Sequence, residues 1–407
     1  MRKLVSRLLA LSFFGLSVAW ASDWPRFLGP NADGTSPETG INKDWKAKPP
    51  KELWRITLGD DGYAGPSVAA GKLYIVDHKG AEDVVRAVDV ATGKDVWTFA
   101  YPDKVKKVYT YGFAVATPTY DNGKLYTASR FAVLHCLDAE KGTKLWSRDL
   151  KKEFKGKRRN ESKFDWGYAE SPRIDGDRLI FCPGGPGAAM VVLDKNSGMD
   201  IWRGGGDDQA GYGSTAIGMI GGKKQYVSFG GVGLFGVDAE KGELLWRYQW
   251  ETEWDVNTAT PIIIGDTVFI SSGYAHGCAL LSIAGNKAEK VWQNQYLQEH
   301  FSTPLLSGGY IYGVGDPNKL ICLDPKTGKL MWSQAGFGKG SVIALDEVLI
   351  TLNGGTGDVA MVKIDPEKYQ ELGRFKPLGG ESWTAPIVAD GKLYVRNHTA
   401  LVCLDLR

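Results

Sequence analysis

One unit of about 45 residues recurs along almost the whole chain, and this repeat restricts the possible folds more than any other feature. In its clearest copy, Thr303-Pro304 opens the unit and Gly308-Gly309 turns the chain into a β-rich run at residues 310–314. A second run follows at residues 320–324, and a last strand begins at residues 330–332. Each unit therefore predicts four short strands, which is typical of one blade of a β-propeller.

The same pattern occurs eight times. Proline opens six units, and the other two begin near a serine: Pro66, Pro118, Pro172, Ser214, Pro261, Pro304, Ser341 and Pro386. A tryptophan starts the closing strand of six units: Trp97, Trp146, Trp202, Trp246, Trp292 and Trp332. In the seventh unit Arg374-Phe375 stands roughly at that place. A four-stranded sheet cannot bury both faces alone, so we expect these tryptophans to wedge between adjacent blades.

The eighth unit stops after three strands, at Arg407, and its missing strand is found at the other end of the chain. Residues 52–56 repeat the closing pattern of residues 244–248. We therefore predict an all-β fold, an eight-bladed β-propeller of four-stranded antiparallel blades whose last blade is closed by an N-terminal strand. The segment around Trp54 should pair with the strand near Val402, because ring closure removes open sheet edges.

Residues 1–21 have the features of a signal peptide: the cations Arg2, Lys3 and Arg7, an apolar stretch at 8–18, and the small-x-small site 19–21. We expect cleavage near Ala21 and a periplasmic or secreted protein, with an N-terminal membrane anchor as the alternative. Residues 22–51 then form an N-terminal leader, and residues 52–407 form a single propeller, expected to be a monomer without a transmembrane segment.

Charge and cysteine content narrow the classes further. The chain has 49 Lys and Arg and 47 Asp and Glu, and loss of the three cations of residues 1–21 leaves 46 against 47. This balance gives no electrostatic reason to expect a nucleic-acid partner. Five cysteines cannot all pair. Three of them occupy one repeat position (Cys136, Cys322 and Cys403), where we expect small buried hydrophobes.

The pattern Leu-Asp-x-x-x-Gly-x-x-x-Trp, as at residues 137–146, resembles the pyrroloquinoline-quinone (PQQ) repeat superfamily of propellers. That superfamily includes quinoprotein alcohol dehydrogenases and the outer-membrane assembly factor BamB. Residues 23–30, 34–40, 168–172 and 338–341 are also similar to exported, BamB-like or PQQ-binding-like propellers of planctomycete-type bacteria. The resemblance extends from Trp24 to the C-terminus.

The resemblance implies two functions. Dehydrogenases of this fold hold PQQ with stacking aromatics, a calcium ion, an aspartate base and usually a disulfide between adjacent cysteines, but this chain has neither adjacent cysteines nor a Cys-x-x-Cys-His haem motif. We therefore expect no cofactor, with PQQ and calcium as the alternative. Oxygen ligands for calcium could come from Glu170, Asp255, Asn257 and Glu381, although each is also suited to bonding nearby loop backbone.

The loops that precede the innermost strands should converge on one mouth of the channel, and they are rich in aromatic residues. From them we select candidate ligand- or partner-binding residues: Tyr111, Trp166, Tyr168, Glu170, Tyr212, Trp254, Asp255, Asn257, His300, Glu381 and Trp383. The alternative is that these side chains pack on one another and plug the channel. His300 could be a base, a metal ligand or a hydrogen-bonded loop histidine. No metal site and no catalytic residue is assigned.

These observations favour an exported, non-catalytic binding or scaffold propeller of the BamB-like kind, with an envelope protein or peptide as partner. The alternative is a PQQ- and calcium-dependent dehydrogenase acting on an alcohol or sugar. A small-molecule or carbohydrate ligand is a third hypothesis, based on the aromatic loops.

Overall fold

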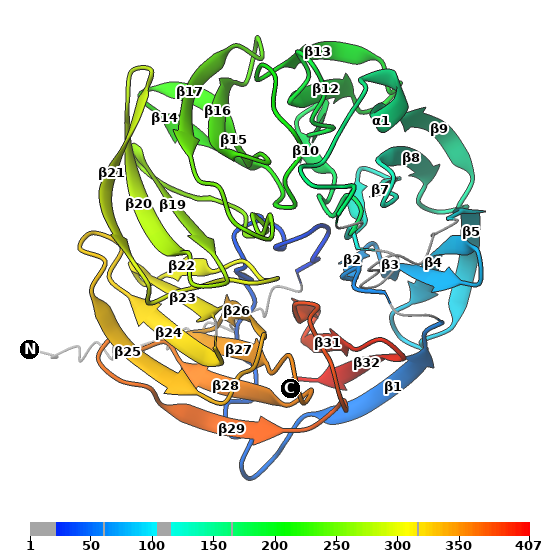
Figure 1. The fold of residues 1–407 in the computed structure, drawn as a ribbon. Coiled ribbons are helices and arrows are strands. Elements are labelled where there is room, and N and C mark those ends of the chain that lie inside the picture. Colours follow the sequence, from blue (N-terminus) through cyan, green and yellow to red (C-terminus); the bar gives the residue numbers. More distant parts are fainter. Residues whose placement is uncertain (1–21, 60–61, 104–114, 164–165, 316) are drawn as a thin grey trace, which may run out of the picture.

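The computed structural model describes residues 22–59, 62–103, 115–163, 166–315 and 317–407. These residues form eight four-stranded antiparallel sheets that surround a central channel as the blades of a propeller (Figure 1). This arrangement confirms the predicted fold. The helix α1 (Leu150–Glu153) is too short to cross a bilayer, and no longer apolar helix occurs in the described ranges. The expected signal peptide at residues 1–21 lies outside them and stays a prediction.

Blades 1 to 4 follow one another along the chain, each built from its innermost to its outermost strand. Blade 1 contains β2 (Ser67–Ala69), β3 (Lys72–Lys79), β4 (Glu82–Asp89) and β5 (Asp95–Pro102). Blade 2 contains β6 (Thr119–Asp121), β7 (Lys124–Ala128), β8 (Val133–Asp138) and β9 (Lys144–Asp149). Blade 3 contains β10 (Arg173–Asp175), β11 (Arg178–Phe181), β12 (Met190–Asp194) and β13 (Asp200–Gly204). Blade 4 contains β14 (Ala216–Ile220), β15 (Lys223–Phe229), β16 (Gly233–Asp238) and β17 (Leu244–Gln249).

Blades 5 to 7 continue in the same order, and blade 8 combines both ends of the chain. Blade 5 contains β18 (Ile262–Ile264), β19 (Thr267–Ser272), β20 (Gly277–Ala284) and β21 (Lys287–Asn294). Blade 6 contains β22 (Leu305–Ser307), β23 (Tyr310–Gly315), β24 (Lys319–Leu323) and β25 (Leu330–Ala335). Blade 7 contains β26 (Ser341–Leu345), β27 (Val348–Leu352), β28 (Val359–Lys363) and β29 (Glu371–Phe375). Blade 8 contains β30 (Ile387–Ala389), β31 (Lys392–Arg396), β32 (Ala400–Asp405) and β1 (Lys51–Thr57).

The N-terminal strand closes the ring as predicted. β1 pairs antiparallel with β32, in a register that sets Trp54 opposite Cys403 and Arg55 opposite Val402. Arg396 at the end of β31 strengthens the junction between blades 8 and 1, because its buried guanidinium donates to the carbonyl oxygens of Gly62 and Ala64. Hydrogen bonds therefore connect the last blade to the loop that enters the first blade.

The repeated sequence pattern forms a turn on which the tryptophan of the preceding blade packs. In blade 2, the Asp138 carboxylate accepts hydrogen bonds from the backbone N–H groups of Glu140 and Lys141. This capping bends the chain back between β8 and β9, and Gly142 completes the turn with a φ of 71°. A Cβ at Gly142 would lie 2.5 Å from the Trp97 ring of blade 1, so only glycine allows the ring to lie flat on the turn.

The same indole hydrogen bond forms at six of the eight blade junctions, and a turn glycine lies under the ring at five of them; the turn that accepts from Trp332 has no glycine. Each indole N–H donates to a backbone carbonyl in the corresponding turn of the next blade: Trp54 to Val90, Trp97 to Ala139, Trp146 to Lys195, Trp202 to Ala239, Trp292 to Pro325 and Trp332 to Asp365. Trp246 is different, because the next unit has a tight turn at Gly285 without the aspartate. Its indole donates to the side-chain oxygen of Gln225 in its own blade.

The seventh blade corrects one detail of the sequence interpretation. We placed Arg374-Phe375 where the tryptophan should stand, but the strand register shows that Gly373 holds this position: it pairs with Met361, as Trp332 pairs with Cys322 in blade 6. A Cβ at Gly373 would lie 2.5 Å from Trp45, whose ring packs edge-on against Phe375 at 5.2 Å. The leader thus supplies the aromatic wedge that the seventh unit lacks.

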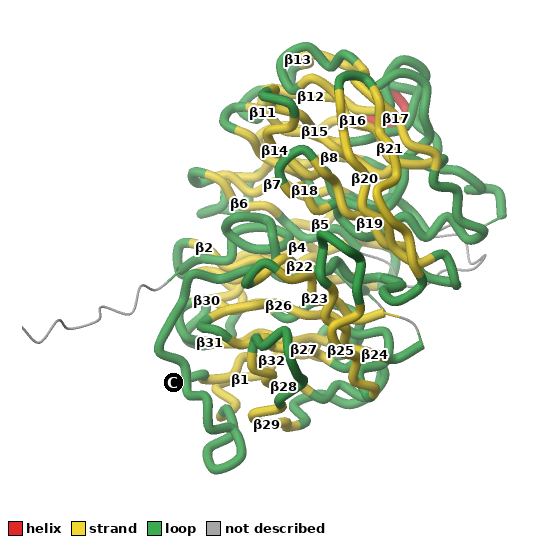
Figure 2. The backbone as a smooth tube through the Cα atoms, turned by 90° about the vertical axis from the view of Figure 1, so that its left-hand side faces the viewer, coloured by secondary structure: helices red, strands yellow, loops and turns green. Residues whose placement is uncertain are grey.

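The leader also crosses one end of the channel. Trp24 forms two backbone hydrogen bonds with Val68 of β2, and Gly34 and Ser36 bond to Ala344 of β26. Glu38 then accepts hydrogen bonds from the N–H groups of Asp390 and Gly391, in the turn after β30. Because these contacts lie at the far ends of the innermost strands, the leader covers the face opposite the loops that enter them; Figure 2 shows it along the left edge of the molecule.

All five cysteines are buried and free of disulfides. Cys136, Cys322 and Cys403 lie in three different blades, in the hydrophobic clusters around the third strands. Burial raises the pKa of each of these thiols to about 12. They therefore pack as small neutral hydrophobes, as their common repeat position indicated.

The contact between Gly142 and Trp97 can be tested with a matched pair of substitutions in one blade. Gly142→Ala and Gly123→Ala both place alanine at a positive φ, 71° and 78°, but the space around Gly123 is empty. We expect Gly123→Ala to cost about 1 kcal/mol of unfolding free energy. Gly142→Ala should cost a further ~1–3 kcal/mol, because its methyl group collides with the indole. Denaturant unfolding of both variants measures this difference, and equal losses would contradict the docking role of the glycine.

Candidate functional site

The central channel contains a cavity of about 260 Å³ that is closed at one end by the leader. Trp24, Phe27 and Leu28 of the leader form part of its wall, and the innermost strands and the loops that enter them supply the rest. The lining side chains with aromatic, hydroxyl or charged groups are Trp24, Phe27, Tyr63, Thr117, Trp166, Ser171, Tyr212, Ser214, Thr258, Tyr274, His300, Phe301, Ser302, Thr303, Lys339, Ser341, Trp383 and Thr384. The leader thus converts an open channel into a blind pocket.

Hydroxyl groups at the start of the innermost strands connect neighbouring blades around this pocket. The Ser171 hydroxyl accepts from the backbone N–H of Thr117 in the preceding blade, and the Ser214 hydroxyl accepts from the N–H of Ser171. Thr303 accepts in the same way from Thr260. These bonds satisfy backbone groups that the short innermost strands leave unpaired, and they hold the pocket wall at a constant radius.

One side of the mouth is a continuous wall of aromatic rings. Tyr63 stacks on Trp383 at a centroid distance of 5.3 Å, and Trp383 stacks on Phe301 at 4.3 Å. The wall continues through His300, 4.2 Å from Phe301, to Tyr274, which lies 4.3 Å from His300. These rings come from the loops of blades 1, 5, 6 and 8, so the wall spans several blade junctions and depends on their relative placement.

A lysine lies among these rings. The Lys339 ammonium is 5.3 Å from the centre of the Phe301 ring, 5.4 Å from that of Tyr274 and 6.0 Å from that of Trp383. It also lies 3.3 Å from Nε2 of His300. Cation–π attraction holds the ammonium at the faces of the rings. Among the described lining residues, Lys339 alone carries a permanent charge, and none of them is a carboxylate.

Four of the predicted site residues line this pocket: Trp166, Tyr212, His300 and Trp383. Two more lie next to the wall, since the Glu381 carboxylate accepts from the Tyr63 hydroxyl at 2.8 Å and Trp254 packs 6.0 Å from Tyr274. Trp254 is 38% exposed and marks the outer rim. Tyr111 lies outside the described residues, so its position stays a prediction.

The other four predicted residues are buried among neighbouring loops and strands, outside the cavity lining. Tyr168 is buried and its hydroxyl donates to the Pro183 carbonyl. Glu170 is buried and accepts hydrogen bonds from the Cys182 N–H and the Thr215 hydroxyl.

Asp255 and Asn257 form a second buried group. Both carboxylate oxygens of Asp255 accept from the Asn160 amide, and Asn257 donates to the Gly230 and Trp250 carbonyls. None of the four belongs to the cavity lining, because each meets backbone or side-chain partners inside the protein. The structure therefore places these four residues beside the pocket and not in its lining.

Three groups of lining residues were not selected from the sequence. Tyr63 precedes the first unit at the place that aromatic residues hold in other units, so the repeat could have identified it. Lys339 lies in the stretch Gly338-Lys339-Gly340, which we noted without assigning a role. Tyr274 belongs to a turn between β19 and β20, and the leader residues lie outside the repeats. Only the folded chain shows that these residues line the pocket.

The four proposed calcium ligands do not form one site. Glu170, Asp255 and Asn257 use their oxygens in buried hydrogen bonds, while Glu381 is bonded to Tyr63 at the outer wall. The described lining residues place hydroxyls, rings and one ammonium in the cavity, but no carboxylate. Calcium requires several converging oxygen ligands, usually including carboxylates, so this part of the chain does not fit a calcium-assisted quinone site.

The buried Glu170 should make stability depend on pH. Burial raises the pKa of its carboxyl to about 7, against the opposing effect of its two hydrogen bonds. The folded chain therefore holds a proton that the unfolded chain releases near its ordinary pKa, and stability falls as pH rises from about 4.5 to 7. We expect a loss of about 3 kcal/mol between about pH 5 and pH 8 from this group. Glu170→Gln should flatten the pH profile of thermal unfolding, and the exposed Glu243→Gln should leave it unchanged; parallel profiles for all three would contradict this.

Comparison with known proteins agrees with this architecture. The family model described as outer membrane protein assembly factor BamB matches residues 44–108 and 81–334. BamB from Moranella endobia (strain PCIT) is 21% identical over 321 residues, which cover 71% of this chain and 73% of that protein. The crystal structure of BamB from Moraxella catarrhalis superposes with a TM-score of 0.62 at 15% identity, covering 88% of this chain and 99% of that one.

A dehydrogenase is also similar. The quinoprotein alcohol dehydrogenase PedH of Pseudomonas putida (strain KT2440) is 24% identical over 281 residues, which cover 61% of this chain but 42% of that protein. The fold and the repeat are thus shared by scaffold proteins and enzymes. Because the family model covers well over half of its residues, the chain belongs to the BamB-like family of PQQ-repeat β-propellers.

Proposed function

We propose that this protein is an exported, non-catalytic propeller that binds a peptide segment of an envelope partner at the aromatic mouth of its channel. The observation that carries the proposal is the blind pocket itself: stacked aromatic rings, a ring of hydroxyls, one imidazole and one ammonium, with no carboxylate among the described lining residues. Aromatic surfaces with a few polar groups are typical of binding sites in which anchor side chains are buried.

The size of the cavity supports a peptide. Its volume of about 260 Å³ lies below the ~300–1,000 Å³ usual for pockets that enclose a whole small ligand. One or two side chains of an extended segment fit, while the rest of the segment would lie along the rim. Phe301 and Trp254 at that rim are 41% and 38% exposed, so they offer apolar contact area outside the cavity.

The charge of the pocket adds a preference. Lys339 is held by three rings and is positioned to meet a carboxylate or a backbone carbonyl of the ligand. An apolar side chain next to an acidic residue is therefore the segment that suits the pocket best. The relatives named as outer membrane protein assembly factors support a partner in the cell envelope.

The second candidate function is a quinone-dependent dehydrogenase, which the similarity to PedH favours. A planar quinone could stack on the rings of Trp383 or Trp166 in the cavity. The missing carboxylates weigh against it, since they would hold the calcium ion and accept the substrate proton. We therefore rank it below the binding function.

Site-specific crosslinking in the cells that produce the protein tests the binding function. A photo-reactive residue at Phe301 should capture a discrete envelope protein, while the same residue at Met199, 69% exposed and far from the pocket lining, should not. Trp383→Ala should reduce the Phe301 crosslink at least tenfold, because it removes the ring on which Phe301 stacks. Equal capture at both positions, or tight binding of an oligosaccharide to the purified protein instead, would contradict the proposal; a thermal melt confirms that Trp383→Ala is folded.

A titration with PQQ and calcium tests the alternative. We expect no shift in melting temperature, no change in the quinone absorption band and no dye reduction with alcohols or sugars, because the described lining lacks carboxylate ligands. Dye reduction that requires both PQQ and calcium, and that is lost in Trp383→Ala, would establish the dehydrogenase and overturn the non-catalytic function.

A further inference from the structure

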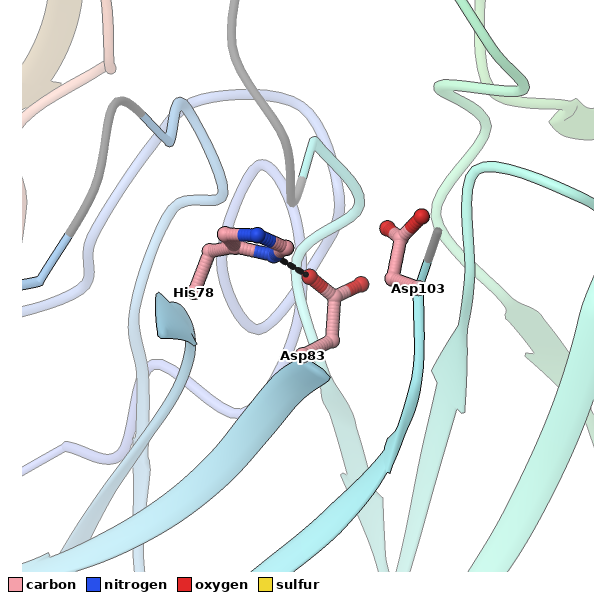
Figure 3. A group of neighbouring side chains, drawn as sticks. All are labelled: His78, Asp83 and Asp103. Atoms are coloured by element: carbon pink, nitrogen blue, oxygen red, sulfur yellow. Dashed lines mark hydrogen bonds and ion pairs between the residues drawn. The ribbon is translucent and has the colours of Figure 1, made fainter. Parts of the chain in front are cut away.

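A cluster of three ionisable side chains lies at the end of blade 1, outside the lining of the central pocket. His78 is the second-last residue of β3, Asp83 lies at the start of β4, and Asp103 directly follows β5. Figure 3 shows the three side chains converging from these neighbouring strands. Nδ1 of His78 lies 2.8 Å from a carboxylate oxygen of Asp83, and one ligand atom from each residue lies within 4.8 Å of the other two.

The cluster is fully buried, and three of its four carboxylate oxygens lack a hydrogen-bond donor among the described residues. The exposed fraction is 0% for His78 and Asp83 and 1% for Asp103. Oδ2 of Asp83 and both carboxylate oxygens of Asp103 have no hydrogen-bond donor within the described ranges. Burying an unpaired carboxylate is strongly unfavourable. Three such oxygens facing one space leave a place for a positive group, in addition to the buried Arg130, whose charge opposes the rise in the pKa of Asp103.

The histidine is oriented as a metal ligand is. Nε2 of His78 lies 3.0 Å from the Gly80 carbonyl oxygen, which can only accept, so Nε2 carries a proton and donates. That bond leaves Nδ1 to face the carboxylates. Ligating histidines typically donate their other ring N–H to a backbone carbonyl or carboxylate, since this fixes the tautomer and the plane of the ring.

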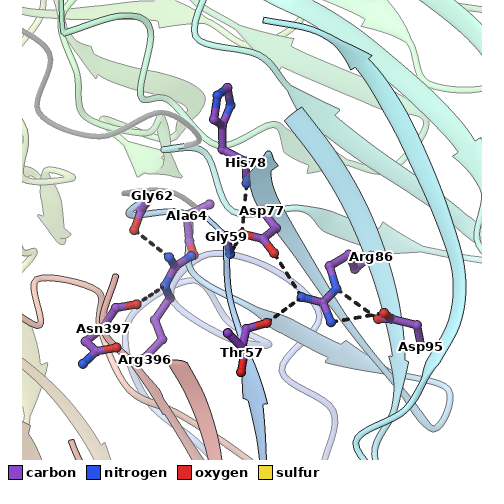
Figure 4. Close-up of polar contacts among 10 residues, drawn as sticks. All are labelled: Thr57, Gly59, Gly62, Ala64, Asp77, His78, Arg86, Asp95, Arg396 and Asn397. Carbon is purple, nitrogen blue, oxygen red and sulfur yellow. Dashed lines mark hydrogen bonds and ion pairs between the residues drawn. The ribbon is translucent and has the colours of Figure 1, made fainter. Parts of the chain in front are cut away.

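The backbone around His78 is also held in place. Its N–H donates to the Asp77 carboxylate at 3.0 Å, and the same carboxylate accepts from the Gly59 N–H and from Arg86 (Figure 4). Arg86 in turn bonds Thr57 of β1 and Asp95 of β5, so this support spans the junction of blades 8 and 1. The position of the imidazole is therefore set before any ion binds.

We propose that His78, Asp83 and Asp103 bind one divalent transition-metal cation. Nδ1 of His78 and the Asp83 carboxylate oxygen are 2.8 Å apart in direct contact. Two ligands about 2.1 Å from one ion lie ~3 to 3.4 Å apart, so binding requires a shift of a few tenths of an ångström. A dication neutralises the two carboxylates and satisfies their free oxygens. One imidazole with two carboxylates and no thiolate suits Zn²⁺, Mn²⁺ or Fe²⁺, whereas Ca²⁺ and Mg²⁺ prefer ligand sets made of oxygen alone.

Such an ion would connect three adjacent strands at the place where β3 and β5 end and β4 begins. Its binding energy would add to the stability of the folded state, because the unfolded chain does not assemble the three ligands. The site is separate from the aromatic pocket and does not depend on the proposed partner.

Zinc titration of the EDTA-treated, full purified chain tests the proposal. We expect one Zn²⁺ per chain by calorimetry and elemental analysis, and a rise in melting temperature that Mg²⁺ does not cause. Asp103→Asn should weaken Zn²⁺ binding at least tenfold, while His276→Gln, which removes a histidine elsewhere in the fold, should leave it unchanged. Co²⁺ added to the unmutated chain should produce a visible absorption band that Zn²⁺ removes, which tests the site without any variant.

The competing explanation is a pair of carboxyl groups that share a proton. Burial and the neighbouring Asp83 raise the pKa of Asp103 to about 7, so a neutral Asp103 could donate to Asp83 without an ion. In that case no metal would bind stoichiometrically, Co²⁺ would give no band, and Asp103→Asn would keep the stability of the unmutated chain. Any of these three results would overturn the proposal.

Discussion

The docking of one tryptophan on the glycine turn of the next blade is the interaction on which the rest of this structure depends. It joins an apolar contact to a hydrogen bond, since at five junctions the ring covers a glycine while its N–H reaches a carbonyl in the same turn. A typical bond of this kind adds about 1 kcal/mol, and six junctions use it. Because Trp54 makes the same contact from the N-terminal strand, the mechanism that joins consecutive blades also closes the ring.

The leader closes one end of the channel inside this ring. It fills the place of the missing tryptophan with Trp45 at blade 7, and it brings Trp24, Phe27 and Leu28 into the channel. Both effects come from one segment that contains no repeat unit. The blind pocket and the stability of the ring are therefore coupled, because the contacts of the leader with β2, β26 and the turn after β30 serve both.

The candidate site shows how far repeat patterns can be used to predict function. Trp166, Tyr212, His300 and Trp383 line the pocket because they stand shortly before an innermost strand, a position that the repeat reveals. Four other residues of the same loops are buried outside the cavity lining: Tyr168, Glu170, Asp255 and Asn257. In a loop the direction of a side chain depends on local dihedral angles and on neighbouring blades, so residue type and spacing cannot distinguish the two groups.

By itself the sequence determined the eight sheets, the closing strand around Trp54 and the aromatic character of one mouth, because these follow from local turn chemistry and from a pattern repeated at a constant period. Tertiary structure alone decided that the leader closes the channel, that Trp45 replaces a missing wedge and that Lys339 lies among three rings. It also brought His78, Asp83 and Asp103 together. These features join segments that belong to no common repeat position, and only the packing of the folded ring brings such segments into contact.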